Sequence, residues 1–242
     1  MPYRVALVNL GCPKNEVDGQ VMLGLLEQAG FEVTGDPDAA DVLLVNTCGF
    51  IAAAEEESVD AILAAARRKE AGDRVIVVAG CLAQRYPGEL MEEMPEVDGL
   101  LGTGMIHQVV QAVQRALEGE RVMAVGDPAS SYGENMPRVR ATPRYTAYLK
   151  IAEGCSNYCT YCAIPLIRGP YRSRPLEHVV AEARKLAAEV VREIILVAQD
   201  TTRYGLDIYG QRCLPRLLKE LVEIPGLTWL RLMYCHPQGI TE

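Results

Sequence analysis

The run YLKIAEGCSNYCTYCAIPLIRGP, residues 148–170, decides how this sequence is interpreted. A strand-like apolar segment leads directly into a loop that carries Cys155, Cys159 and Cys162 at C-x-x-x-C-x-x-C spacing. Three thiolates on one short loop can hold three corners of a cubane iron–sulfur cluster and leave the fourth iron without a protein ligand. The pattern therefore predicts a 4Fe-4S cluster whose open iron can bind a substrate.

Two other interpretations of this loop stay open. It can bind zinc, with Cys213, Cys235, His178 or His236 as the fourth ligand. Zinc sites favour paired C-x-x-C steps and four closed ligands, whereas these cysteines crowd one loop without a partner pair nearby. The cysteines can also be core residues, but the loop around them is polar and follows a strand end, where α/β folds keep their sites.

The sequence on both sides of this loop alternates apolar runs with amphipathic stretches, which is typical of parallel strands joined by helices. We predict strands at 3–9, 31–34, 42–46, 75–79, 145–152, 193–197 and 228–234, and helices at 16–29, 51–71, 106–117, 176–189 and 214–223. Between 126 and 144 the periodicity gives way to a linker-like composition. The predicted organisation is an amino-terminal domain at 1–126, a linker at 127–144 and a second domain at 145–242.

A second group of cysteines is scattered through the first half. Cys12, Cys48 and Cys81 each follow a predicted strand and precede a helix. Because the carboxyl ends of parallel strands meet at one edge of a sheet, these thiols can converge. A single such cysteine is often a small buried apolar residue, but three in equivalent positions indicate a shared metal centre.

The composition limits where the protein is expected to be found and how its cysteines are used. The 242 residues are 49% hydrophobic and carry eight cysteines and a formal net charge of −8. We find no secretion signal and no apolar run of the roughly 18 residues that a membrane helix needs, so we expect a cytoplasmic protein without a membrane partner. In that compartment the cysteines are not expected to form disulfides.

The negative charge argues against nucleic-acid binding over the whole surface, which would require clustered positive charge. One basic stretch is a local exception, and we interpret it either as a basic lip beside a site or as scattered surface charge. It contains Arg138, Arg140, Arg144, Lys150, Arg168, Arg172 and Arg174.

Five motifs together resemble the radical S-adenosylmethionine (SAM) methylthiotransferases. They are GCPKNEVD from residue 11, TCGFI from 47, GCLAQRY from 80, GCSNYCTYCAIPLIRGPYRSRP from 154 and VAQDTTRYG from 197. The likeness covers nearly the whole chain, and it is greatest to the branch that modifies an aspartate of the twelfth small-subunit ribosomal protein. The resemblance implies an α/β fold in which a doubly wound, mostly parallel domain precedes the first three strands of a radical SAM (βα)6 partial barrel.

The resemblance also implies cofactors and ligands. Two 4Fe-4S clusters are expected, an auxiliary one on Cys12, Cys48 and Cys81 and a radical cluster on Cys155, Cys159 and Cys162. In this family the open iron of the radical cluster chelates SAM, and an electron then cleaves the cofactor to a radical that can take hydrogen from a saturated carbon. The expected partners are the ribosomal protein or the ribosome, a reducing electron donor and a sulfur donor.

Weaker candidates surround these ligands. Tyr161 resembles the aromatic residue that lines the adenine of SAM, and Gln199, Asp200 and Thr201 follow a barrel strand and are expected to contact cofactor or substrate. Cys213 and Cys235 match no family position and are interpreted as structural. The alternative functions are a tRNA adenosine methylthiotransferase, which shares both cysteine groups, and a non-catalytic iron–sulfur or zinc-binding module.

Overall fold

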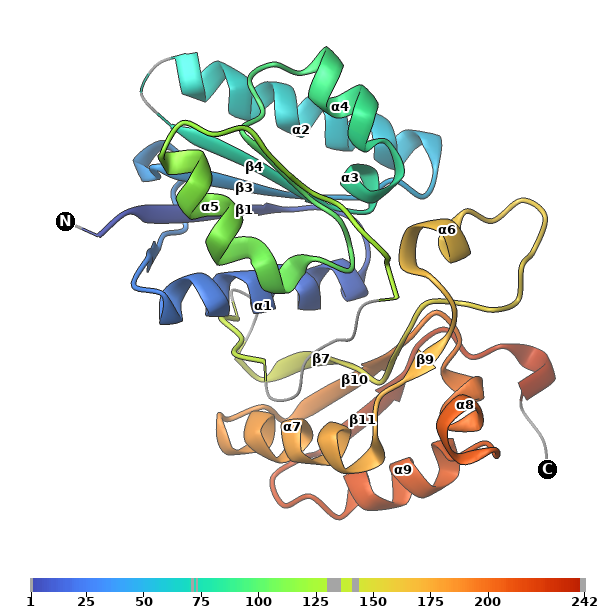
Figure 1. The fold of residues 1–242 in the computed structure, drawn as a ribbon. Helices are drawn as coiled ribbons and strands as arrows, with labels where there is room; N and C mark the ends of the chain where they lie inside the picture. The colour runs from blue at the N-terminus through green and yellow to red at the C-terminus, as the bar shows by residue number, and fades with distance from the viewer. Residues whose placement is uncertain (1, 71, 73, 130–135, 141–143, 240–242) are drawn as a thin grey trace. The chain divides into compact units, whose positions relative to one another are not determined.

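A computed structural model describes residues 2–70, 72, 74–129, 136–140 and 144–239 (Figure 1). Contacts divide the chain into two units. The first contains Met1–Val139 and Cys162–Arg168, and the second contains Arg140–Tyr161 and Gly169–Glu242. The division falls within the predicted linker, but the sequence did not predict that the segment after Cys162 belongs with the amino-terminal unit.

A six-stranded, all-parallel sheet forms the centre of the first unit, with strand order β2-β1-β3-β4-β5-β6. The strands are β1 (Arg4–Asn9), β2 (Glu32–Val33), β3 (Val42–Thr47), β4 (Val75–Gly80), β5 (Gly99–Leu101) and β6 (Val122–Ala124). All six residues of β3 are buried. Helices therefore cover both faces of the sheet, and this explains why the central strands are continuous apolar runs rather than alternating ones.

The helices of this unit lie on both sides of the sheet (Figure 1). They are α1 (Pro13–Gln28), α2 (Ala52–Glu70), α3 (Cys81–Arg85), α4 (Pro87–Glu93), α5 (Val109–Leu117) and α6 (Ile164–Arg168), with 3-10 turns η1 (Pro37–Ala39) and η2 (Ile106–Gln108). Leu26 of α1 and Val113 of α5 share one core with Val77, whereas Ile62 of α2 belongs to a separate core with Val78. Successive strand residues point to opposite faces, so the doubly wound α/β arrangement is confirmed.

The strand order places the first two cysteines of the amino-terminal group. From β1 the chain crosses to β2 on one side, and it then returns to β3 on the other side of β1. Such a reversal opens a crevice at the carboxyl ends of the two strands, and α/β proteins bind their ligands there. Cys12 follows β1 and Cys48 follows β3, so both lie where this reversal of strand order occurs.

The predicted elements of the first unit are found, with shifted ends. The first helix begins at Pro13 instead of residue 16, because proline is favoured at the first helical position and Cys12 serves as the N-cap residue. Gly30, with φ 92°, follows the C-cap residue Ala29 of this helix. The sequence did not predict β5 and β6, which have three residues each and are too short to show a period. Ala71, the predicted end of the second helix, lies outside the described residues.

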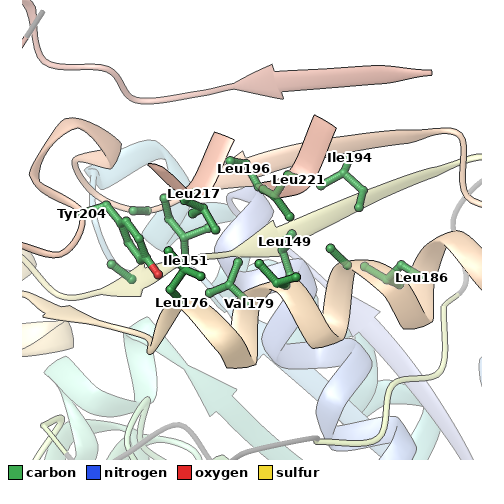
Figure 2. Close-up of a cluster of buried hydrophobic side chains, with 14 of the residues drawn as sticks. Leu149, Ile151, Leu176, Val179, Leu186, Ile194, Leu196, Tyr204, Leu217 and Leu221 are labelled. Carbon is green, nitrogen blue, oxygen red and sulfur yellow. The ribbon is translucent and has the colours of Figure 1, made fainter. Parts of the chain in front are cut away.

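The second unit contains a three-stranded parallel sheet of order β11-β10-β7, built from β7 (Thr146–Lys150), β10 (Glu193–Val197) and β11 (Trp229–Leu232). Helices α7 (Leu176–Ala188) and α9 (Leu214–Val222) contribute Val179 and Leu217 to a core with Leu149 and Leu196 (Figure 2). These elements agree with the predicted first three strands of a partial barrel.

Shorter elements complete the second unit. They are the antiparallel pair β8 (Ala152–Glu153) and β9 (Arg172–Ser173), helix α8 (Leu206–Tyr209), and the 3-10 turns η3 (Thr201–Arg203) and η4 (Pro237–Gly239). The predicted strand 145–152 is therefore two strands, because the chain leaves the parallel sheet after Lys150 to pair with β9. Among the described residues of both units, no helix is long and apolar enough to span a bilayer.

Candidate metal centres

Three neighbouring strands carry the amino-terminal cysteines at the same edge of the sheet. Strand β1 pairs with β3, and β3 pairs with β4, so the residues after their carboxyl ends are adjacent. Cys12 is the N-cap residue of α1, Cys48 directly follows β3, and Cys81 is the first residue of α3. The three cysteine loops thus lie at one edge of the sheet, and their joint role as metal ligands stays a prediction.

Close backbone contacts hold the three cysteine loops together. Gly11 has φ +87°, and a Cβ atom there would lie 2.9 Å from Cys48 Cβ and 3.3 Å from Cys48 Sγ. A Cβ atom on Gly49 would lie 3.0 Å from the carbonyl carbon of Cys81. Each loop therefore packs against the next one, and the glycines permit an approach that larger residues would prevent.

Hydrogen bonds from buried polar side chains fix the shape of this edge. Ser58 is fully buried, and its hydroxyl accepts from the backbone N–H of Cys48 at 3.0 Å and donates to the Cys48 carbonyl at 2.9 Å. The amide Nδ2 of Asn15 donates to the carbonyl of Leu10 at 3.0 Å and to that of Thr47 at 2.8 Å. Asn15 thereby ties the loop after β1 to the end of β3.

The thiols of this group influence one another electrostatically. Burial raises the pKa of the Cys81 thiol, the guanidinium of Arg168 opposes this rise, and the nearby Cys12 and Cys48 add to it. Burial also raises the pKa of Cys48, and Cys12 contributes in the same direction. A deprotonated thiol disfavours a second one close by, so these effects indicate that the three sulfur atoms share one environment.

Arg168 is a cation in direct contact with a thiol of this group. Its side chain is 1% exposed, and Nη1 donates to Asp18 Oδ2 at 3.0 Å. Nη2 donates to Asn15 Oδ1 at 2.6 Å and lies 3.5 Å from the sulfur of Cys81. The sequence did not connect Arg168 to this site, because the contact joins segments 87 residues apart.

The burial of Arg168 corrects part of the basic-lip interpretation. Lys150, Arg168 and Arg174 are at most 8% exposed, and their partners are Glu153, Asp18 and Glu182, respectively. Cations that are buried in ion pairs do not form a surface for an acidic partner. The prediction is therefore wrong for these three residues.

The donor chemistry of the amino-terminal thiols suits an iron–sulfur cluster. No three Cys, His, Asp or Glu side chains within the described ranges are grouped closely enough to hold one metal ion. In a cubane each thiolate binds a different iron. Three free thiols from adjacent strand ends supply the donor set for three corners of such a cluster.

The second group of cysteines lies on the loop after β8. The backbone N–H of Cys155 donates to the Gly169 carbonyl at 3.0 Å, and Ser156 Oγ accepts from the N–H of Tyr171 at 3.0 Å. Cys155 is half-buried and Cys159 is exposed. Cys162 is half-buried and begins the segment that the contacts assign to the first unit.

One predicted cofactor contact lies in a pocket of the second unit. This cavity of about 480 Å³ is lined by Cys159, Asp200, Thr202, Arg203 and His236, among others. Asp200 Oδ1 accepts from the N–H and the hydroxyl of Thr202, at 3.0 and 2.6 Å. The sequence did not indicate Arg203 as a site residue, because it stands in no recognisable spacing with the cysteines, and it offered His236 only as a possible fourth zinc ligand.

The other predicted cofactor residues have different surroundings. Tyr161 is 88% exposed, and Gln199 is half-buried. Thr201 is fully buried, and its hydroxyl donates to the carbonyls of Met233 and Tyr234 at 3.0 and 3.3 Å. That hydroxyl therefore holds the chain that follows β11, and a cofactor role for these three residues stays a prediction.

The two cysteines outside the predicted triads differ from each other. Cys213 is buried at the N-terminus of α9, as a structural residue should be. Cys235 is exposed, and its sulfur lies 3.4 Å from the hydroxyl of Thr201.

Two family models match the chain. Residues 4–102 match the uncharacterized protein family UPF0004, and residues 149–228 match the radical SAM superfamily. The first match contains the three amino-terminal cysteines, and the second contains the three cysteines of the loop.

Relatives with a described function match over nearly the whole chain. The ribosomal protein uS12 methylthiotransferase RimO of Pelotomaculum thermopropionicum is 55% identical over 100% of this chain and 55% of its own length. RimO of Desulforudis audaxviator is also 55% identical, over 98% of this chain and 53% of its own length. The chain thus spans about half the length of these relatives.

Solved structures share the fold at low identity. The radical SAM methyltransferase TsrM from Kitasatospora setae, bound to tryptophan and a SAM analogue, aligns with a TM-score of 0.62 over 94% of this chain and 54% of its own, at 18% identity. The cobalamin-dependent SAM radical enzyme OxsB aligns with a TM-score of 0.54 at 14% identity. From these matches, the chain carries a UPF0004 domain followed by a radical SAM domain, and it is similar over nearly its whole length to the uS12 methylthiotransferases RimO.

Proposed function

We propose that this protein methylthiolates the β-carbon of an aspartate in ribosomal protein uS12 by radical SAM chemistry. The observation that carries the proposal is the 55% identity to RimO over the whole chain, together with both cysteine triads at the positions that the resemblance assigns to them. A methylthio group replaces a hydrogen on a saturated carbon in this reaction, and a general base in water cannot remove such a hydrogen at a useful rate.

The proposed ligands form two sites. Cys12, Cys48 and Cys81 would hold an auxiliary 4Fe-4S cluster, and Cys155, Cys159 and Cys162 a second one that binds SAM. When bound, these groups supply the one-electron chemistry that activates the aspartate carbon and a place for the sulfur that is transferred. Each site offers three thiolates and leaves one iron for a substrate, whereas a fourth cysteine would block that position.

The chain's own residues prepare the amino-terminal site. Ser58 and Asn15 fix the loops that carry the thiols, and the burial of Cys81 limits the access of water. Exclusion of water from this ligand strengthens the electrostatic contacts around it. We assign to these residues the positioning of the ligands and not a direct role in the reaction.

The pocket beside Cys159 is the proposed SAM-binding region of the second unit. Asp200 and Thr202 offer polar groups there, and the arginine at 203 supplies a cation for a carboxylate. Tyr161, Gln199 and Thr201 remain the proposed additional contacts. The reaction also needs a reducing electron donor and a sulfur donor, which we propose as partners beside the ribosomal protein.

Mass spectrometry tests this function. The full-length protein, reconstituted anaerobically with iron and sulfide, is incubated with SAM, a reductant, a sulfur donor and either ribosomal small subunits or unmodified tRNA. We expect a methylthio group on one aspartate of uS12 and an unchanged tRNA.

The matched control uses small subunits in which the modified aspartate is replaced by alanine, and these should stay unmodified. Methylthiolation of tRNA instead would contradict the proposal and favour the adenosine branch. Zinc with little iron in the reconstituted protein would also contradict it, because a closed zinc site cannot support this chemistry.

A further inference from the structure

We infer that Arg168 is a positioning residue of the amino-terminal metal centre, where it holds Cys81 and keeps a charged N–H donor at the sulfur of that ligand. This inference rests on the proposed function, because it takes Cys12, Cys48 and Cys81 as the ligands of the auxiliary cluster. The inference is based on the contacts of the Arg168 guanidinium. Its two terminal nitrogen atoms together contact Asp18, Asn15 and the Cys81 sulfur.

The burial of Arg168 indicates a specific role. Removing a cation from water costs several kcal/mol, and an ion pair compensates for this cost only with good geometry and further hydrogen bonds. Asp18, whose side chain is 5% exposed, provides the opposite charge, and Asn15 provides a second acceptor. A further contact of the guanidinium is with the Cys81 sulfur, at 3.5 Å. A neutral thiol is a weak acceptor, and a thiolate bound to iron is a stronger one.

The segment that carries Arg168 is held firmly in the first unit. Ile164 and Ile167 of α6 are buried, and the hydroxyl of Thr103 donates to the Ile167 carbonyl at 2.6 Å. Helix α6 also contacts α3, whose first residue is Cys81. The guanidinium is therefore presented to the sulfur by a fixed backbone, and this gives a hydrogen bond a defined direction.

Asn15 connects the loops that carry the cysteines to Arg168. Its Nδ2 is used by the carbonyls of Leu10 and Thr47, so its Oδ1 is turned toward Arg168, and the Cys81 sulfur lies 3.7 Å from the same oxygen. The loop after β1, the end of β3 and the start of α3 thus meet at one amide. Arg168 closes this network from a segment far along the chain.

Two measurable properties follow from a charged donor at a ligand sulfur. Hydrogen bonds to the sulfurs of a cluster raise its reduction potential, so the loss of Arg168 should shift the potential to a more negative value. Residues that orient metal ligands typically change metal affinity by about 10- to 100-fold when they are replaced. A purely structural arginine would change stability without changing the potential.

The test uses the full-length protein with Cys155, Cys159 and Cys162 replaced by alanine, so that only the amino-terminal cysteines can bind a cluster. Arg168→Gln is compared with this parent for iron content, iron release to a chelator, and reduction potential by a titration followed with electron paramagnetic resonance. We expect a more negative potential and iron release about 10- to 100-fold faster than in the parent.

Arg121→Gln is the matched control, because Arg121 donates to the carbonyls of Met91, Met94 and Val97 and lies in the same unit. It should leave the potential unchanged. If Arg168→Gln does not fold, Arg168→Lys takes its place. Lysine keeps the positive charge but lacks the planar set of N–H donors, so the reduction potential should still fall. A folded Arg168 variant with the potential and iron release of the parent overturns the inference.

The same experiment separates this inference from the proposed function. A parent protein that binds no iron at the amino-terminal cysteines refutes the auxiliary cluster itself. A parent that binds the cluster, with an Arg168 variant that behaves identically, refutes only the role of Arg168.

Discussion

Cys81 and Cys159 belong to triads of the same predicted chemistry, but their surroundings differ. Cys81 is 4% exposed at the first turn of a helix and lies next to Arg168 and Asn15. Cys159 is exposed on a loop in which Tyr158 adopts a positive φ of 47°. One site is prepared by the packing of a whole sheet, and the other relies on the spacing of its own loop. Similar sets of candidate ligands can thus be positioned by long-range packing or by local spacing.

The largest expected effect comes from removing each triad separately. Replacing Cys155, Cys159 and Cys162 by alanine should abolish reductive cleavage of SAM, because the cofactor then has no iron to bind. Replacing Cys12, Cys48 and Cys81 should spare cleavage and stop sulfur insertion. In both variants the iron content should fall from about eight to about four per chain, as for one lost cubane.

Product analysis and iron determination check these outcomes. A Cys213→Ala variant is the control, since this cysteine is buried at the start of α9 and should leave the iron content unchanged. Methylthio transfer by the variant without Cys12, Cys48 and Cys81 would contradict the auxiliary site.

A substitution at Gly80 tests whether the amino-terminal site depends on the sheet. Gly80 precedes Cys81 with φ 96° and ψ −151°, and a Cβ atom there would lie 2.6 Å from the Thr47 carbonyl oxygen. Gly80→Ala should therefore lower the free energy of unfolding by about 3 kcal/mol or more and weaken iron binding at this triad. Urea unfolding and iron determination measure both effects.

Gly30→Ala is the matched control for this change. Gly30 has a similar φ of +92°, but an added Cβ atom meets no atom of the described residues within 4 Å. It should cost about 1 kcal/mol, from the backbone conformation alone. Equal losses in the two variants would show that the strand ends are not tightly packed around Cys81.

The smallest expected effect concerns the reactivity of the metal-free thiols. Iodoacetamide should alkylate the exposed Cys159 at least about tenfold faster than the buried Cys81, because the buried thiol reacts only after local opening. Peptide mapping at successive times measures both rates under native conditions. A chain unfolded in urea provides the control, in which the rates should become similar. Equal rates in the folded protein would remove the contrast between the two sites.

Local patterns were enough to predict most of the elements and to single out candidate ligands. The spacing around Cys159 and the positions of Cys12, Cys48 and Cys81 after apolar runs pointed to both triads before any fold was known. Hydrophobic periodicity predicted the long helices, because each buries one face against a sheet. The three-residue strands β5 and β6 were missed, since they become strands only by pairing with a neighbour.

Spacing and hydropathy along the chain were sufficient to predict the fold class and to single out the candidate iron ligands. The folded structure was needed to show that three distant cysteine loops touch and that Arg168 lies against Cys81 instead of on a basic surface. The physical reason is that such contacts, up to 153 residues apart for Arg168 and Asn15, result from the packing of many elements at once. No local pattern records that packing.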